Sequence, residues 1–263
     1  MHRPVCRVIA SGAGLALLGM IATPANAQTA GVKEKPPLYK YASYWEFPPA
    51  HWREVDKDNA SSNQKILAPA LADGTLVGYG DDESLVHSDQ GFTHGKWWQS
   101  RSVAGLMKVL ETFQKSGGLN SPLLVSSIRH QDQMFVSRFY NWKAGHWKSA
   151  YKYTGTYKLK SDVPDPDAAV KSLSGFYVPV FEKMLADGIV VDYEIDREMI
   201  HSTDSPGRIV FAFVMPGAES LDKFRAALGA ALGNNSLILP AFGATMANVT
   251  PQADFLRVNA TYK

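Results

Sequence analysis

Residues 71–88 read LADGTLVGYGDDESLVHS, and residues 185–202 read LADGIVVDYEIDREMIHS. A shift of 114 positions superposes the first stretch on the second without a gap, with nine identities in eighteen. Unrelated sequences of average composition would share about one. A period of this length is too long for a solenoid repeat and corresponds to a small domain copied once. The sequence therefore predicts two similar halves.

The first 27 residues have the pattern of an export signal. Arg3 and Arg7 form a basic start, residues 8–22 form an apolar run, and Ala25-Asn26-Ala27 fits a cleavage site. An uncleaved anchor is the alternative, but the apolar run of about 15 residues is shorter than the ~20 needed to cross a bilayer. We expect residues 1–27 to be a signal peptide that is removed, which gives a periplasmic or secreted chain with no membrane insertion after cleavage.

Composition excludes several classes of partner and site. Removal of residues 1–27 takes away Arg3, Arg7 and the chain's one cysteine, Cys6, so that 25 basic side chains remain against 25 acidic ones. A neutral chain without a Lys/Arg cluster lacks the electrostatic footprint of nucleic-acid or anionic-membrane binding. A chain without cysteine forms neither disulfides nor Cys-ligated metal sites. We expect a soluble globular protein that binds no nucleic acid.

Each half has the same predicted order of elements. In the first half these are a strand at 39–47, a helix ending at Gly74, strands at 76–87 and 96–100, a helix at 103–115 and a strand containing 135–140. In the second half they are a strand at 151–159, a helix ending at Gly188, strands at 189–201 and 207–214, a helix containing 221–232 and a strand containing 255–262. Glycine closes helices readily because it accepts the left-handed conformation.

The predicted order is βαββαβ, twice. We assign residues 39–142 to the first repeat and 151–263 to the second, with an N-terminal linker at 28–38 and a second linker at 143–150. This order resembles the ferredoxin-like unit, and two such units in one chain resemble the fused form of the dimeric α/β-barrel superfamily. The resemblance rests on element order and the internal repeat, and it covers nearly the whole mature chain.

The resemblance implies an α+β fold in which two tandem ferredoxin-like repeats form a pseudo-dimeric α/β barrel. A chain of this kind would be a monomer or a weak homo-oligomer. The superfamily includes cofactor-independent monooxygenases that act on aromatic substrates, lactone isomerases and haem-dependent enzymes. The resemblance places a small molecule between sheet and helices or between the two sheets.

His87 and His201 occupy the same position in the two halves, at the end of the second strand and before a serine. Metal binding would need both near one point with further ligands, and the spacing specifies no third ligand. We therefore expect no metal and no cofactor. In the structural interpretation, a strand-end histidine hydrogen-bonds the adjoining turn. Haem is the alternative; it needs one axial histidine, and His87, His130 and His201 are all eligible.

Aromatic content distinguishes the two halves. All six tryptophans lie in or just after the first repeat. A binding surface formed by that repeat would explain the bias, because Trp and Tyr combine apolar faces with a hydrogen-bonding edge. The alternative is that duplicated cores are filled differently, with Trp97 and Trp98 on opposite faces of one strand, so that only one lines an interior. Arg129 and His130 lie in the polar run 126–133, which we expect to be a loop.

No motif in the chain specifies a reaction. Asp82 is matched by Asp196, but one shared carboxylate per repeat is not a glycosidase acid/base pair. The first hypothesis is an exported protein that binds a small apolar or aromatic molecule, or a protein partner. The alternative is a barrel enzyme of cofactor-independent monooxygenase or haem-dependent type. The candidate ligand-binding residues are His87, Trp97, Trp98, Arg129, His130 and His201. We rank the binder first because no convergent catalytic set is visible.

Overall fold

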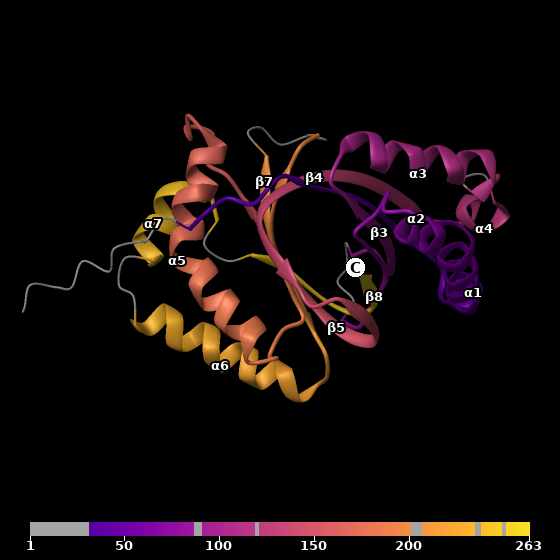
Figure 1. The fold of residues 1–263 in the computed structure, drawn as a ribbon. Coiled ribbons are helices and arrows are strands. Elements are labelled where there is room, and N and C mark those ends of the chain that lie inside the picture. The colour runs from indigo at the N-terminus through magenta and orange to yellow at the C-terminus, as the bar shows by residue number, and fades with distance from the viewer. Residues whose placement is uncertain (1–31, 87–90, 119–120, 201–206, 235–237, 249–250) are drawn as a thin grey trace, which may run out of the picture.

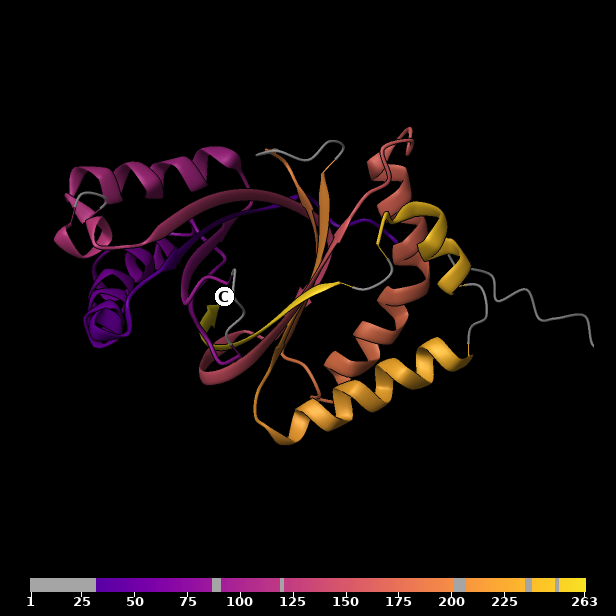
Figure 2. The same cartoon turned by 180° about the vertical axis from the view of Figure 1, so that it is seen from behind.

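The computed structural model describes residues 32–86, 91–118, 121–200, 207–234, 238–248 and 251–263. Within these residues, eight antiparallel strands close into a barrel in the order β1-β3-β2-β8-β5-β7-β6-β4. Helices gather in two groups on opposite sides of the barrel, as Figures 1 and 2 show from front and back. The prediction of an α+β barrel is confirmed at this level.

The first half of the chain forms one side of the barrel. Its elements are β1 (Leu38–Glu46), η1 (Pro49–His51), α1 (Trp52–Ser62), η2 (Asn63–Leu67), α2 (Ala68–Ala72), β2 (Gly78–Ser84), β3 (His94–Ser100), α3 (Val103–Lys115), α4 (Pro122–Val125) and β4 (Arg129–Trp142). Helix α3 begins where the Ser102 hydroxyl accepts a hydrogen bond from the Gly105 amide. Its buried residues Leu106, Val109 and Phe113 are three or four positions apart, so they face the sheet together.

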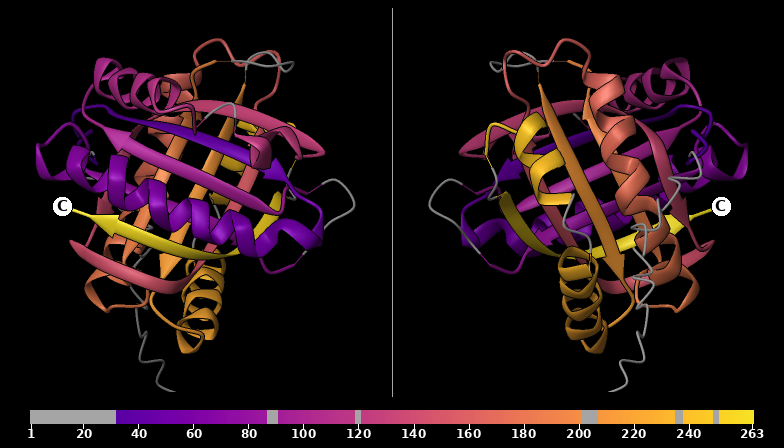
Figure 3. Two further views of the ribbon diagram at one scale, coloured as in Figure 1. Left: turned by 90° about the vertical axis from the view of Figure 1, so that its right-hand side faces the viewer. Right: turned by 90° about the vertical axis from the view of Figure 1, so that its left-hand side faces the viewer.

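The second half forms the other side. Its elements are β5 (Gly145–Lys158), α5 (Pro166–Ala186), β6 (Asp192–Glu198), β7 (Arg208–Met215), α6 (Glu219–Asn234), α7 (Ile238–Thr245) and β8 (Gln252–Tyr262). Gly74 and Gly188, with φ of +81° and +72°, follow the ends of α2 and α5 as the sequence predicted. In Figure 3 the indigo helix α1 lies in front of the barrel strands in the left view, and the salmon helix α5 lies on the side of the barrel that faces the viewer in the right view.

Two strand boundaries differ from the prediction. The run 126–133 was expected to be a loop, but β4 starts at Arg129, because Trp45 and Glu46 of β1 lie in register with His130 and Arg129. Strand β5 starts at Gly145, in register with Tyr262, so residues 145–150 lie in a strand where we expected a linker. Polar residues are compatible with a strand when backbone pairing holds it on a partly solvated edge.

Alternating side chains divide the protein into an interior and two outer layers. The barrel interior holds a small apolar cluster that includes Trp97, Phe135 and Tyr262. Outside it, helices of the first half pack on a cluster around Trp98, and helices of the second half pack on a larger cluster around Phe181. Within the described residues, no helix combines the length and hydropathy required to cross a bilayer.

Candidate functional site

Two cavities share the wall formed by strands β1, β3 and β4. The outer cavity, of about 600 Å³, lies between the outer face of these strands and helices α1, α3 and α4; its lining includes Tyr41, Ser43, Trp45, Lys96, Trp98, Phe113, His130 and Asp132. The barrel cavity, of about 120 Å³, lies inside the barrel; its lining includes Lys40, Tyr44, Asp82, Lys152, Asp196 and Asp254.

A polar row crosses the floor of the outer cavity. It consists of Lys96, Ser43 and Asp132, which lie in register on β3, β1 and β4. Residues directly opposite each other on antiparallel strands have their Cβ atoms about 5 Å apart. The three side chains therefore lie next to one another on the face that the helices cover.

Aromatic residues border the polar row on one side. Tyr41, two residues before Ser43 on β1, lies in register with Trp98 of β3 and with Met134 of β4. Trp98 stacks between Tyr41, at 4.4 Å between ring centroids, and Phe113 of α3, at 5.4 Å. Burial and the Asp132 carboxylate raise the pKa of Tyr41, so its phenol stays protonated. This side of the cavity is a flat, apolar wall that suits an aromatic ring.

A hydrogen-bonded cluster borders the row on the other side. His130 Nε2 is 2.9 Å from both Ser43 Oγ and Asp132 Oδ1, and the Ser43 hydroxyl donates to the same carboxylate oxygen. The His130 ring stacks on Trp45 with centroids 5.2 Å apart. The side chains of His130 and Asp132 are 45% and 42% exposed, so this end of the cavity reaches solvent.

Lys96 is the buried charged group of the outer cavity. It is 5% exposed and donates a hydrogen bond to Ser62 of α1, and its ammonium lies 5.7 Å from the centroid of the Phe113 ring. Within the described part of the chain, no carboxylate lies within ion-pair distance of it. Burial lowers the pKa of Lys96 to about 8, although Asp81 and Asp58 act in the opposite direction.

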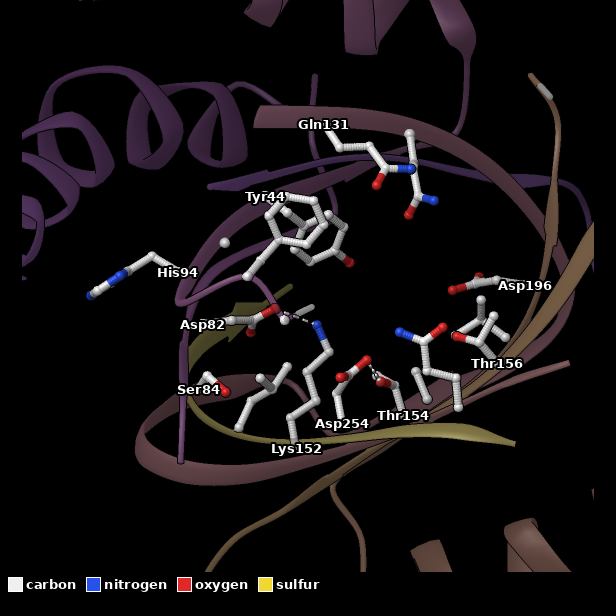
Figure 4. Close-up of a pocket in the computed structure, with 18 of the residues that line it drawn as sticks. Tyr44, Asp82, Ser84, His94, Gln131, Lys152, Thr154, Thr156, Asp196 and Asp254 are labelled. Carbon is white, nitrogen blue, oxygen red and sulfur yellow. Dashed lines mark hydrogen bonds and ion pairs between the residues drawn. The ribbon is translucent and has the colours of Figure 1, made fainter. Parts of the chain in front are cut away.

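The barrel cavity contains two buried lysine–carboxylate groups. Lys152 Nζ lies 2.7 Å from Asp82 Oδ2 (Figure 4). Lys40 Nζ lies 2.7 Å from Glu194 Oε2 and also contacts Asp196. Burial raises the pKa of Asp196 to about 7, against the opposing influence of Lys40. The matched residues Asp82 and Asp196 thus each pair with a lysine of the other half.

The structure separates the predicted site residues. Trp97 faces the barrel interior and packs on Tyr262 at 5.8 Å, whereas Trp98 faces the outer cavity. The expected opposite orientation of these two tryptophans is confirmed. His130 lines the outer cavity. Arg129 lies outside the lining of both cavities, where it pairs with Glu46 at 2.8 Å. His87 and His201 lie outside the described residues.

Sequence reasoning did not identify the residues of the polar row or the interior lysines. Lys40 and Lys152 had a visible signal, because both stand in the Tyr-Lys-Tyr start shared by the two halves, at the inward position of a strand. Lys96 precedes two tryptophans, Trp97 and Trp98, which is a weaker indication of a buried lysine than the shared Tyr-Lys-Tyr pattern. Asp132 was hidden in a polar run that we interpreted as a loop.

Among the described residues, the Nε2 atom of His130 is not available as an axial haem ligand. Of the three eligible histidines, the described residues include His130. Its Nε2 is engaged by Ser43 and Asp132, and one ring face is covered by Trp45. An axial histidine needs a ring nitrogen free to bind iron. In the described ranges, no group of three or more His, Asp or Glu side chains is arranged to hold a metal ion.

Comparison with solved structures supports the fold. A candidate monooxygenase from Lactobacillus acidophilus NCFM aligns over 87% of this chain and 97% of its own, at 10% identity and a TM-score of 0.64. One from Fusobacterium nucleatum subsp. nucleatum ATCC 25586 aligns over 87% and 95%, at 10% identity and a TM-score of 0.61. An anthrone oxidase-like protein aligns over 87% and 94%, at 10% identity and a TM-score of 0.55.

No protein-family model matches the chain, and no curated protein is similar to it in sequence. The structural neighbours therefore support the α+β barrel fold alone, and function has to be argued from the site itself.

Proposed function

We propose that this protein binds a small aromatic molecule carrying an anionic group in the outer cavity. The observation that carries the proposal is Lys96, a buried ammonium in the lining of an aromatic-rich cavity. Among the described residues, it has one hydrogen-bond acceptor, the Ser62 hydroxyl. A buried charge without a counter-ion is costly. A bound carboxylate or phenolate would supply that counter-ion.

The shape and lining of the cavity support the same class of molecule. Its volume of about 600 Å³ falls within the range of small-molecule sites. The stacked rings of Trp98 and Phe113 form an apolar wall next to Lys96, so an aromatic ring could pack against this wall while its charged substituent reaches the ammonium. The solvent-reaching end at His130 and Asp132 gives a route of entry.

Calorimetric titration with 1-naphthoate and the neutral 1-naphthalenemethanol tests the proposal. We expect Lys96→Met to weaken 1-naphthoate binding at least about tenfold, because a charge-assisted hydrogen bond is lost, and to leave the alcohol nearly unaffected. Lys115→Met is the matched control, since Lys115 is an 80% exposed lysine of α3. The proposal fails if 1-naphthoate does not bind, or if Lys96→Met binds it as well as the unaltered chain.

A second candidate function is a cofactor-independent monooxygenase. The cluster of Ser43, His130 and Asp132 favours it, because the imidazole could accept a proton from an aromatic hydroxyl while the carboxylate stabilises the resulting charge. The names of the structural neighbours, candidate monooxygenases and an anthrone oxidase-like protein, point in the same direction. We rank it second because a proton acceptor alone does not specify a reaction.

The origin and location of the chain belong to the same proposal. The matching stretches 71–88 and 185–202 support descent of both halves from one duplicated unit. The signal-like residues 1–27 support export and cleavage after Ala27. We infer a periplasmic or secreted protein that acts as a monomer or a weak homo-oligomer.

A further inference from the structure

Asp82 and Asp196 occupy matching positions in the barrel wall, but their second carboxylate oxygens differ. Each aspartate places Oδ2 against a lysine. Asp82 Oδ1 accepts a hydrogen bond of 3.2 Å from the Trp97 indole nitrogen. Asp196 Oδ1 has no hydrogen-bond partner among the described residues, although Asp196 is 1% exposed. A buried carboxylate oxygen without a donor is costly and rare, so it requires an explanation.

The two aspartates differ because the large side chain of the neighbouring residue pair stands on a different strand in each half. Trp97 on β3 lies in register with Gly80 on β2, and a Cβ at Gly80 would lie 2.5 Å from the indole ring. In the second half the corresponding pair is Ala212 on β7 and Glu194 on β6. Ala212 therefore leaves open the place that the indole fills in the first half, and it lines the barrel cavity there.

The charges of the interior favour a cation at this place. Asp82, Glu194 and Asp196 face Lys40 and Lys152 across the interior, so these five groups carry one negative charge in excess when Asp196 is ionised. Burial raises the pKa of the neighbouring Asp192 well above its ordinary value, which keeps that carboxyl neutral. Figure 4 shows the Asp196 carboxylate pointing into the open centre of the barrel cavity, with Asp254 on another wall. In the described part of the chain, Asp254 accepts one side-chain hydrogen bond, of 3.5 Å, from Thr154.

We propose that the barrel cavity binds a small organic cation whose primary ammonium group donates a hydrogen bond to Asp196 Oδ1. The ammonium takes the role that the Trp97 indole plays for Asp82. Phe135 and Val210 provide an apolar wall for a short alkyl chain. The cavity of about 120 Å³ has room for such a molecule or for about four waters at ~30 Å³ each. An organic cation is preferred to a metal ion, because no group of three or more acidic or histidine side chains in the described ranges is arranged as a metal site.

Three probes separate charge from hydrogen bonding in a calorimetric titration at pH 8, where Asp196 is mainly ionised. These are n-butylammonium, n-butanol, which donates a hydrogen bond without charge, and tetramethylammonium, which carries charge without an N–H. We expect one n-butylammonium to bind per chain, with the other two at least about tenfold weaker. Absence of saturable n-butylammonium binding, or equal binding of n-butanol, overturns the proposal and leaves a cavity that holds water only.

Two variants locate the site. Asp196→Asn should weaken n-butylammonium binding at least about tenfold, and the fold should survive because Lys40 keeps Glu194 at 2.7 Å. The pair Ala212→Trp and Glu194→Gly transplants the first-half arrangement and should close the cavity. Lys96→Met, in the outer cavity, is the control that should bind n-butylammonium normally, whereas Asp196→Asn should still bind 1-naphthoate. Normal n-butylammonium binding by Asp196→Asn would place the amine elsewhere and refute the assignment.

Discussion

The helix-covered faces of the two halves differ at one row of side chains. In the first half, Ser43 lies in register with Lys96 and Asp132, and the row forms the floor of a cavity. In the second half the corresponding residue is Gly155, in register with Phe211 and Ala253. Phe211 of that row belongs to the largest apolar cluster among the described residues, where it packs on Tyr177 at 5.4 Å. One strand arrangement thus supports either a filled core or a cavity with polar groups.

The helices explain why one face is filled and the other hollow. Helix α5 buries eight residues, among them Tyr177, Phe181 and Met184, and these fill the space above the strands. Helix α1 buries two residues, Val55 and Asn59. A helix with so few apolar residues does not fill the volume above a sheet, so the space under α1 stays open. The second half therefore has the larger apolar cluster, and the first half retains a cavity under its helices.

The largest effect should come from placing a lysine in the filled row. Phe211→Lys would bury an ammonium among aromatic rings with no cavity around it, and we expect a loss of more than about 4 kcal/mol in the free energy of unfolding. Urea denaturation would measure it, with Phe211→Leu as the control for lost volume. If Phe211→Lys is no less stable than Phe211→Leu, the contrast between the halves does not hold.

The next effect concerns Lys96 and pH. Burial lowers the pKa of Lys96 from its ordinary value of 10.5 to about 8, which corresponds to a cost of roughly 3 kcal/mol for keeping the buried ammonium charged. Because the unfolded chain binds the proton more tightly, Lys96 destabilises the fold below pH 8, and that penalty is lost as the pH rises towards 10.5.

We therefore expect Lys96→Met to be more stable than the unaltered chain at pH 7. The difference in their free energies of unfolding should shrink between about pH 8 and 10. Urea denaturation of both chains across this pH range measures the difference. Both chains contain the same tyrosines, so the effect of tyrosine titration largely cancels. A pH-independent difference would show that Lys96 is solvated. The same titration should weaken 1-naphthoate binding above about pH 8, because the ammonium loses its charge.

The smallest expected effect is on oxygen consumption. If the first half only binds, the chain should not accelerate oxygen uptake by anthrone above the buffer rate, and His130→Gln should behave the same. An oxygen electrode gives the measurement. Catalysed uptake that His130→Gln removes would replace the binding function with the monooxygenase alternative and assign the proton acceptor.

The sequence predicted element order better than it predicted the site. Periodic apolar residues placed α3 at Val103–Lys115, and the two helix-ending glycines were found where expected. These features depend on local chemistry. The barrel closure, with β2 beside β8 and β4 beside β6, depends on pairing between distant strands. A family resemblance suggested that closure; periodicity does not specify it.

The site could be predicted only in part. The tryptophan bias pointed to the first half, and Trp98 and His130 do line its cavity. The polar row, however, is assembled from three strands, and no spacing along the chain brings Lys96, Ser43 and Asp132 together. The low apolar content of residues 52–62 was a usable signal for the cavity, because it shows that the covering helix does not fill the space.

The lysine–aspartate pairs of the interior bear on how such a protein arises. Lys40 of the first half meets Asp196 of the second, and Lys152 of the second meets Asp82 of the first. Such reciprocity is the rule for an isologous interface, where residue i contacts j and j contacts i. If the halves descend from a homodimeric ancestor, both pairs would have been intersubunit contacts, and gene fusion would have converted quaternary structure into tertiary structure. Either half expressed alone would then bury a lysine and an aspartate with no partner unless it dimerised.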